Sequence, residues 1–185
     1  MSLSIVILAA GKGTRMRSDL PKVLQPLAHK PLLGYVIDAS MSFKPKELVV
    51  VYGYGGDLVK KTFPSPHIQW VEQKEQLGTG HALQQAVPLI NDGGNTLILY
   101  GDVPLIDQKT IERLIIKGKK NLAVLTYLKE DPKGYGRIVR KDGQIQKIVE
   151  EKDCDESQKN IKEINTGIMC VPNHLLKNWL TRLTN

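Results

Sequence analysis

Short, mostly apolar segments rich in β-branched residues recur along the chain. The first, at residues 4–9, reads Ser-Ile-Val-Ile-Leu-Ala and has no polar residue after its first position. Continuous runs of this kind are typical of strands buried on both faces of a parallel sheet. The same pattern predicts five strands in the first 128 residues, at 4–9, 47–52, 68–71, 96–100 and 122–128.

Segments with helical periodicity lie between these strands. Residues 31–42 have Pro31 in the expected first turn and an apolar face of Leu33, Val36, Ile37 and Met41. Three more helices are predicted: residues 57–63 capped by Asp57, residues 78–87 stopped or kinked at Pro88, and a helix capped by Asp107 with Ile111, Leu114 and Ile115 on its apolar face. This alternation predicts a Rossmann-like α/β fold with an open, mostly parallel sheet.

The pattern changes after residue 128. Residues 137–140 and 145–149 flank Lys141-Asp142-Gly143, and an Asp-Gly pair between such segments is typical of a tight β-hairpin. Residues 164–171 predict one more strand, and residues 173–183 a final helix. We therefore expect a β-hairpin region added at one edge of the sheet.

Composition narrows the class of protein. The 185 residues, 41% of them hydrophobic and 24% charged, are typical of one soluble domain and exclude a disordered chain or a disulfide scaffold. Cys154 and Cys170 form no CxxC pattern, which favours reduced thiols in the cytoplasm. The apolar run at residues 5–10 is far shorter than the ~18 residues of a membrane span. Basic residues follow that run instead of preceding it, so we expect no secretory signal.

Positive charge is concentrated near the start of the chain. Of the net charge of +7, residues 1–30 contribute +4, from Lys12, Arg15, Arg17, Lys22 and Lys30 against Asp19. Because so much of the positive charge lies in this one short segment, it suggests a phosphate ligand more than a nucleic-acid surface. Aromatic residues make up only 5% of the chain and no nucleic-acid-binding motif is present, so nucleic-acid binding is suggested by the basic pI alone.

The loop after the first strand is the first place to look for that phosphate, because ligands of such sheets bind beyond the carboxyl ends of the strands. It reads LAAGKGTRM, which matches neither GxxxxGK[ST] nor GxGxxG, since Met16 stands where the last Gly would be. Small residues allow backbone N–H groups to approach phosphate oxygens, Arg15 and Lys22 supply charge, and Pro21 restricts the backbone before Lys22. Taken alone, the GKG segment favours a solvated glycine turn.

The complete pattern, LAAGKGTRM followed by Pro21-Lys22, resembles the signature of the sugar-phosphate nucleotidyltransferases. These enzymes join a nucleoside triphosphate to a sugar phosphate. The resemblance implies a nucleotide site in which Arg15 and Lys22 act as catalytic cations. It also implies substrate contacts from Leu8, Ala9, Ala10, Gly11, Gly13 and Thr14.

A second segment, QKEQLGTGHA at residues 73–82, suits a pyrimidine base. Uracil presents an acceptor, a donor and an acceptor along one edge, and glutamine amides can both donate and accept. Surface solvation is the alternative for two loop glutamines. The segment resembles the uracil-recognition segment of the bacterial N-acetylglucosamine-1-phosphate uridyltransferases, which implies nucleoside contacts from Gln73, Gln76, Gly78 and Thr79. His81 is expected in the first helical turn with no chemical role.

The strand at residues 96–100 leads into Gly101-Asp102-Val103-Pro104. A carboxylate at the carboxyl end of a strand suits Mg²⁺ held together with phosphate oxygens. The alternative is that Asp102 caps a turn before Pro104. LYGDVPLI resembles the same family, which implies that Asp102 is a magnesium ligand and that Tyr100 contacts the substrate.

Three later segments, at residues 134–137, 148–150 and 163–167, also resemble these uridyltransferases. The resemblance implies that Gly136 contributes a backbone N–H and that Glu150 and Asn165 hydrogen-bond an acetamido sugar. Sugar hydroxyls need acceptors and amides at fixed positions, which agrees with these residue types. Without the resemblance, Glu150 in its Val-Glu-Glu-Lys run is a solvated charge.

The resemblance covers residues 3–185 and corresponds to the amino-terminal half of a bifunctional uridyltransferase and acetyltransferase family. It implies the nucleotide-diphospho-sugar transferase fold, with residues 1–185 forming a truncated nucleotidyltransferase domain. The acetyltransferase β-helix domain is not part of the sequence. Because relatives trimerise through that domain, we expect a monomer or weak dimer. The resemblance also places a second magnesium ligand and further sugar contacts beyond the position of Asn185, so we expect low activity. We expect a cytoplasmic protein without nucleic-acid or membrane partners.

The implied reaction converts UTP and N-acetylglucosamine 1-phosphate to UDP-N-acetylglucosamine and pyrophosphate with Mg²⁺, for peptidoglycan and lipopolysaccharide synthesis. One alternative is a sugar-phosphate nucleotidyltransferase with another base or sugar. Another is an idle nucleotide-binding module, whose signature would be the loss of Arg15, Lys22 or Asp102. All three residues are present.

Overall fold

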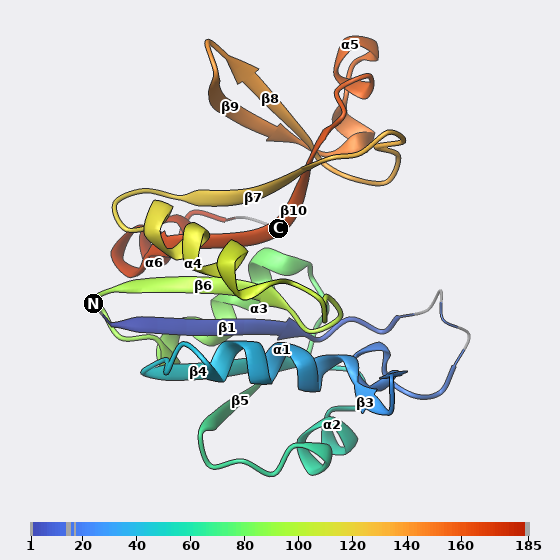
Figure 1. The fold of residues 1–185 in the computed structure, drawn as a ribbon, viewed down its shortest axis with the longest axis vertical. Coiled ribbons are helices and arrows are strands. Elements are labelled where there is room, and N and C mark those ends of the chain that lie inside the picture. The colour runs from blue at the N-terminus through green and yellow to red at the C-terminus, as the bar shows by residue number, and fades with distance from the viewer. Residues whose placement is uncertain (1, 14–15, 17, 184–185) are drawn as a thin grey trace. The chain divides into compact units, whose positions relative to one another are not determined.

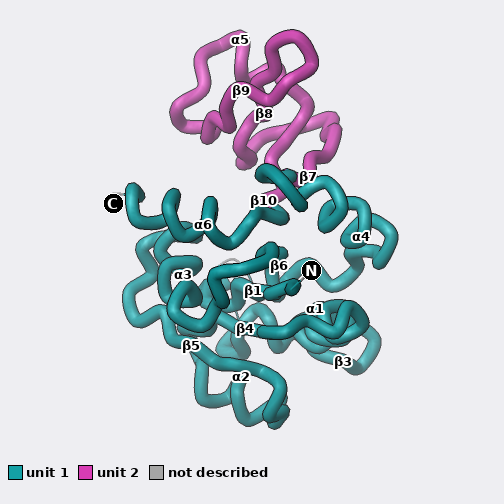
Figure 2. The backbone as a smooth tube through the Cα atoms, turned by 90° about the vertical axis from the view of Figure 1, so that its left-hand side faces the viewer, with its two compact units in different colours: residues 1–123, 169–185 teal, residues 124–168 magenta. Residues whose placement is uncertain are grey.

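The computed structural model describes residues 2–13, 16 and 18–183. The chain forms two compact units, shown in teal and magenta in Figure 2. Unit 1 contains residues 1–123 and 169–185, and unit 2 contains residues 124–168. Among the described residues, no helix combines the length and the apolar character needed to cross a bilayer.

A parallel sheet forms the centre of unit 1 (Figure 1). Its order is β5 (Ile68–Glu72), β4 (Glu47–Tyr52), β1 (Leu3–Ala9) and β6 (Asn95–Tyr100), with neighbouring strands parallel throughout. Residues 169–172 of β10 (Glu163–Pro172) pair antiparallel with β6. The predicted open, mostly parallel sheet is therefore confirmed.

Helices cover both faces of this sheet. In Figure 2, α3 (Thr79–Ala86) and α6 (Asn173–Leu180) lie on one face, and α1 (Leu32–Met41) and α4 (Gln108–Lys117) lie on the other. The remaining elements of unit 1 are short: the ribbon of β2 (Pro26–Leu27) and β3 (Lys30–Pro31), α2 (Gly56–Thr62), and 3₁₀ turns at Lys22–Leu24 and Val87–Leu89.

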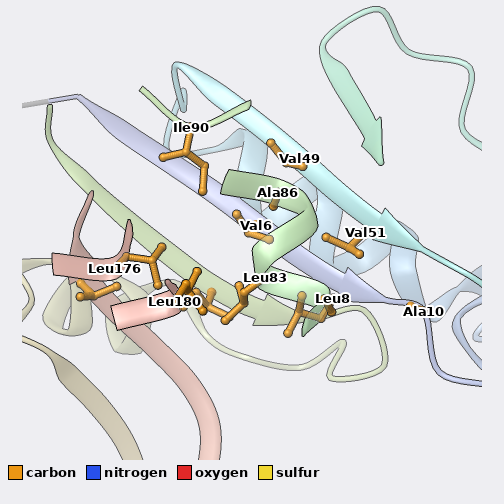
Figure 3. Packing of buried hydrophobic residues seen from close by; sticks show 13 residues of the cluster. Val6, Leu8, Ala10, Val49, Val51, Leu83, Ala86, Ile90, Leu176 and Leu180 are labelled. Atoms are coloured by element: carbon orange, nitrogen blue, oxygen red, sulfur yellow. The ribbon is translucent and has the colours of Figure 1, made fainter. Parts of the chain in front are cut away.

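The apolar core lies between the sheet and its helices. Val6 and Val49 of the sheet pack against Ala86 of α3, and Leu176 belongs to the same cluster from α6 (Figure 3). Both faces of β1 are buried, because every residue from Ser4 to Ala9 is at most 7% exposed. Burial on both faces explains why this strand has no polar alternation.

Several predicted helix ends need correction. Asp57 does not cap α2, because Gly55 precedes the helix with φ of 65° and Asp57 lies in the first turn, 3.5 Å from Lys60. Pro31 precedes α1 instead of lying in its first turn, and Met41, at the last position, is exposed. The final helix α6 ends at Leu180.

The predicted cap of α4 is confirmed. The Asp107 carboxylate accepts a hydrogen bond from the backbone N–H of Thr110 at 2.9 Å. Hydrogen bonds from the hydroxyl and the N–H of Thr110 lower the pKa of Asp107. Ile111 and Leu114 of this helix are buried, as predicted.

Unit 2 is built on β7 (Ala123–Leu128), β8 (Arg137–Lys141), β9 (Gln144–Val149) and the first part of β10, with α5 (Glu156–Lys159) and a 3₁₀ turn at Glu151–Asp153. The predicted hairpin is confirmed, because β8 and β9 pair antiparallel across Asp142 and Gly143. Both turn residues have positive φ, as a two-residue turn of this type requires. The Arg140 guanidinium holds Glu163 by two 2.7 Å hydrogen bonds and lowers the pKa of that carboxyl.

The two cysteines are free, as predicted. Burial raises the pKa of the Cys170 thiol to about 12. This thiol lies against Gly118, where an added Cβ would come within 2.7 Å of the Cys170 side chain. Cys170 therefore acts as a protonated core residue.

A buried polar network holds the start of α6. The Asn173 side chain, 0% exposed, accepts a hydrogen bond from the Thr96 hydroxyl at 2.7 Å. Its amide nitrogen donates to the carbonyl oxygens of Asn91 and Gly93 at 3.0 and 2.9 Å. One side chain thus joins α6, β6 and the turn before β6.

We expect Asn173→Ala to destabilise the protein strongly. The substitution leaves the buried Thr96 hydroxyl without its acceptor, which costs ~1–3 kcal/mol, and removes two part-buried hydrogen bonds to carbonyls, so the free energy of unfolding should fall by about 2–4 kcal/mol. Urea unfolding measures the change. The control is Asn178→Ala, at an exposed position of the same helix, which should lose less than about 0.5 kcal/mol. Equal losses for the two variants would contradict a structural role for the Asn173 network.

Candidate active site

A cleft opens in unit 1 where the parallel strands end. Leu8 of β1 lies opposite Tyr100 of β6, so the loops that follow both strands leave the sheet at the same edge. The Gly101 N–H donates to the Leu8 carbonyl at 2.9 Å, which ties the two loops together. The cleft has a volume of about 340 Å³, within the range typical of small-molecule sites.

Three distant parts of the chain line this cleft. Twelve of the residues that sequence analysis assigns to the site are among them: Leu8, Ala9, Ala10, Gly11, Gly13, Lys22, Gln73, Gln76, Gly78, Thr79, Tyr100 and Asp102. Thr14 and Arg15 lie outside the described residues. Val23 and Ala82 also line the cleft and were not predicted. Both side chains are buried, and their burial depends on tertiary packing.

The loop after β1 packs directly on Lys22. Gly13 has φ of 61°, and a Cβ at this position would lie 2.6 Å from the Lys22 Cβ. A larger residue is therefore excluded both by the backbone conformation and by the lack of space. Pro21 has φ of −49° and precedes the 3₁₀ turn that begins at Lys22, as expected from its restricted backbone.

Lys22 and Asp102 form an ion pair in the cleft. The Lys22 Nζ lies 2.5 Å from an Asp102 carboxylate oxygen, and the two side chains are 36% and 27% exposed. Within the described residues, the Asp102 carboxylate is paired with this lysine and not with the turn before Pro104, which disfavours a capping role. The pair places a cationic group at the carboxylate, where a metal ion was predicted.

The carboxylate alone is a small donor set for a metal. Among the described residues, no group of three or more His, Cys, Asp and Glu side chains is placed to hold a metal ion. Mg²⁺ is commonly held by one or two carboxylates together with substrate phosphates and waters. The single hard oxygen ligand Asp102 beside a glycine-rich loop fits that mode of binding.

The loop between β5 and α3 is held by Gln73. Its backbone N–H donates to the Tyr52 carbonyl at 2.8 Å, and its side chain is buried. The side-chain nitrogen lies 3.0 Å from the Gly78 carbonyl oxygen and 3.1 Å from Nδ1 of His81. Gly78, with φ of 101°, then begins α3, and Gln76 is exposed at the mouth of the cleft.

His81 therefore has a contact that sequence analysis did not assign. It lies in the first turn of α3, where helical side chains lean toward the N-terminus of the helix. That direction brings its ring back to Gln73, which stands eight positions earlier in the sequence. The helical position of His81 was predictable from the sequence. Its contact with Gln73 was not, because that contact depends on the path of the loop between β5 and α3.

Unit 2 brings the three predicted sugar contacts together. The Asn165 N–H donates to the Gly136 carbonyl at 2.8 Å, and a Cβ on Gly136 would lie 3.2 Å from a carboxylate oxygen of Glu150. The neighbouring Arg137 is 2% exposed, donates to the Tyr135 carbonyl and lies 3.8 Å from Glu151. This buried guanidinium fixes the loop that precedes β8.

Comparison with known proteins places these features in a family. Residues 5–154 match the MobA-like NTP transferase domain. The chain belongs to this family of nucleotidyltransferases.

Curated relatives with high sequence similarity to this chain come from Acinetobacter. A "Bifunctional protein GlmU" from Acinetobacter baumannii is 57% identical over the whole of this chain, and a protein of the same name from Acinetobacter baylyi is 52% identical. In both cases the chain covers 41% of the relative. The chain therefore spans about two fifths of the length of these curated relatives.

Solved structures show the same fold at low sequence identity. A UDP-glucose pyrophosphorylase complexed with UDP-glucose has a TM-score of 0.80 and 17% identity, covering all of this chain and 81% of that chain. An apo UDP-glucose pyrophosphorylase has a TM-score of 0.75 and 17% identity, covering 96% and 79%. The nucleotide-sugar transferase fold predicted from the sequence is confirmed.

We expect the Lys22–Asp102 pair to contribute little to stability. Ion pairs between partly exposed side chains are worth at most ~1 kcal/mol, because water screens them and ordering two side chains costs entropy. Lys22→Met and Asp102→Asn should therefore each change the free energy of unfolding by less than about 1 kcal/mol. Urea titration of both variants beside the wild type measures this. A loss as large as that of Asn173→Ala would make the pair a structural element.

Proposed function

We propose that this domain transfers a uridylyl group from UTP to N-acetylglucosamine 1-phosphate, releasing pyrophosphate. The observation that carries the proposal is the single cleft that gathers the glycine-rich loop after β1, Lys22, Asp102 and the glutamine loop before α3. Membership of the NTP transferase family and 57% identity to a bifunctional GlmU protein support the same class of reaction. The resemblance of residues 73–82 to a uracil-recognition segment supports uridine as the nucleoside.

In the proposed reaction, an oxygen of the sugar phosphate attacks the α-phosphorus of UTP in line with the leaving pyrophosphate. Such transfers depend on positioning and on charge stabilisation, with little need for a covalent group from the protein. The backbone N–H groups of Gly11 and Gly13 would bind phosphate oxygens. The Lys22 ammonium would neutralise charge that develops during the transfer, and Arg15 would act as a second cation.

Asp102 would hold Mg²⁺ in this reaction. The bound ion would supply positive charge that stabilises the phosphate groups during the transfer. Because Lys22 lies on the Asp102 carboxylate, phosphates that attract the lysine would also release the carboxylate. Lys22 and Asp102 would then both act on the same triphosphate.

In unit 2, Gly136, Glu150 and Asn165 would bind the acetamido sugar. Their closeness to one another supports this part of the proposal. The Glu150 carboxylate is exposed and can accept from sugar hydroxyls, while the Gly136 N–H and the Asn165 side chain offer amide partners. The product would feed cell-wall precursor synthesis in the cytoplasm. We propose that the chain acts as a monomer or weak dimer.

We expect Lys22→Ala to lower turnover about a hundredfold. Removing one preorganised charge-stabilising group costs roughly 3 kcal/mol of transition-state stabilisation. Pyrophosphate release by the 185-residue chain measures turnover with UTP, N-acetylglucosamine 1-phosphate and Mg²⁺. Lys120→Ala, at an exposed position of the same unit, is the control and should keep its turnover. Turnover within about twofold of wild type for Lys22→Ala would contradict the catalytic role. A preference for CTP or dTTP over UTP would replace the uridylyl assignment by another nucleotide.

We expect Gln76→Ala to weaken UTP binding while leaving pyrophosphate binding unchanged. Gln76 lies at the mouth of the cleft beside Gly53, and loss of one hydrogen bond to a desolvated base costs ~1–3 kcal/mol. Titration calorimetry of both ligands measures the difference. Gln69→Ala, an exposed glutamine on β5, is the matched control. If UTP affinity is the same in both variants, Gln76 does not contact the base.

A further inference from the structure

The predicted sugar contacts of unit 2 lie in one row across three strands. Arg137 of β8 stands opposite Val149 of β9 and Ile164 of β10, and both pairings are antiparallel. In an antiparallel pair, the residue before one partner stands opposite the residue after the other. The row next to that of Arg137 and its two partners consists of Gly136, Glu150 and Asn165, and we call it the sugar row.

Contacts between members of the sugar row agree with this register. The Asn165 N–H donates to the Gly136 carbonyl at 2.8 Å. A Cβ on Gly136 would lie 3.2 Å from a carboxylate oxygen of Glu150, so the two positions share one face of the strands. Side chains of successive strand residues alternate between the two faces. The Arg137 side chain therefore lies on the face opposite to the Glu150 carboxylate.

On that opposite face, Arg137 is buried and holds the segment that leads into the sugar row. It is 2% exposed, and one terminal nitrogen of its guanidinium donates to the Tyr135 carbonyl. The other terminal nitrogen lies 3.8 Å from a Glu151 carboxylate oxygen. The second oxygen of Glu151 accepts a hydrogen bond from the Gly134 N–H. Arg137 and Glu151 thus hold residues 134–136 by two backbone groups.

Arginine is a costly residue for this position. Its charge is permanent, and the 3.8 Å separation from Glu151 is longer than a charge-assisted hydrogen bond, which spans about 2.7–2.9 Å. Within the described residues, Nε of Arg137 is buried and has no hydrogen-bond partner. An apolar side chain of similar volume commonly gives equal or greater stability than a poorly paired buried charge. Stability therefore does not account for this arginine, whereas its hold on residues 134–136 does.

We propose that Arg137 is a positioning residue for the sugar. By holding residues 134–136, it keeps the Gly136 backbone in line with Glu150 and Asn165. A residue that supports binding groups in this way changes the affinity for the ligand through their placement, without a contact of its own. This inference rests on the proposed function, since it assumes that the sugar row binds N-acetylglucosamine 1-phosphate.

Arg137→Met is the first test variant. It removes the charge and the hydrogen bonds but keeps an unbranched side chain that can pack in the same space. The Glu151 carboxylate is 35% exposed, so water can solvate it once the arginine is gone. We therefore expect the variant to remain folded.

Two further variants complete the series. Glu151→Gln keeps an acceptor for the Gly134 N–H and removes the charge opposite Arg137. Arg140→Met is the matched control, because it makes the same change on the same strand and breaks a different ion pair, with Glu163.

The measurement is the affinity for N-acetylglucosamine 1-phosphate, followed through the backbone ¹H–¹⁵N signals of Gly136 and Asn165 in the 185-residue chain. Titration calorimetry of the same samples with UTP reports on unit 1. We expect the sugar phosphate to bind about tenfold more weakly to Arg137→Met and about threefold more weakly to Glu151→Gln, because each loses part of the hold on Gly136. UTP affinity in both variants, and both affinities in Arg140→Met, should stay within about twofold of wild type.

Two results would overturn the inference. One is an affinity for the sugar phosphate that Arg137→Met and Glu151→Gln leave unchanged. The other is an equal loss of affinity for the sugar phosphate and for UTP, because a general disturbance of the fold weakens both. If Arg137→Met does not fold, the result for Glu151→Gln decides. A wild type in which the sugar phosphate shifts neither amide signal would instead overturn the sugar assignment of the proposed function.

Discussion

The parallel pairing of β1 with β4 and β6 is the constraint on which the rest of unit 1 depends. A parallel pair needs a crossover segment, and both faces of the sheet must then be covered by helices. The carboxyl ends of the strands consequently meet at one edge, where their loops cannot be covered by the same helices. The hydrogen bond from Gly101 to Leu8 fixes the spacing of two of these loops. The cleft follows from the topology before any side chain is considered.

Stability and function are assigned to different polar groups in this domain. The Asn173 side chain is fully buried, and both ends of its amide make hydrogen bonds within the protein, so it joins elements of the fold. Lys22 and Asp102 instead remain partly exposed and neutralise each other across the cleft. Groups of the second kind can exchange their partner for a ligand at small cost in stability, as the phosphate and metal binding that we propose for this cleft would require.

The glutamine loop shows how the conformation of the backbone controls side-chain chemistry. Gly78 has φ of 101°, and this turn directs its carbonyl at the Gln73 amide. An amide is symmetric in shape and opposite in hydrogen bonding at its two ends, so the partners of its nitrogen matter for the arrangement of the loop. That arrangement therefore depends on contacts between residues that are not neighbours in the sequence, including one with a histidine whose residue type alone indicates no role.

The sequence alone determined the fold class, the succession of strands along the chain and most residues of the cleft. Short apolar runs such as residues 4–9 predict buried strands because they are rich in β-branched residues and are soon followed by a glycine-containing loop, whereas continuous hydrophobicity by itself would also fit a buried helix segment. Motifs such as LAAGKGTRM and LYGDVPLI lie at strand ends, so their common location follows from the parallel topology. Helix ends were less predictable, as Gly55 in place of Asp57 before α2 shows. Only the tertiary structure decided the Lys22–Asp102 pair, the contact of His81 with Gln73 and the burial of Arg137. Each of these features depends on the paths of loops and strands that bring distant parts of the chain together. The local sequence does not encode those paths.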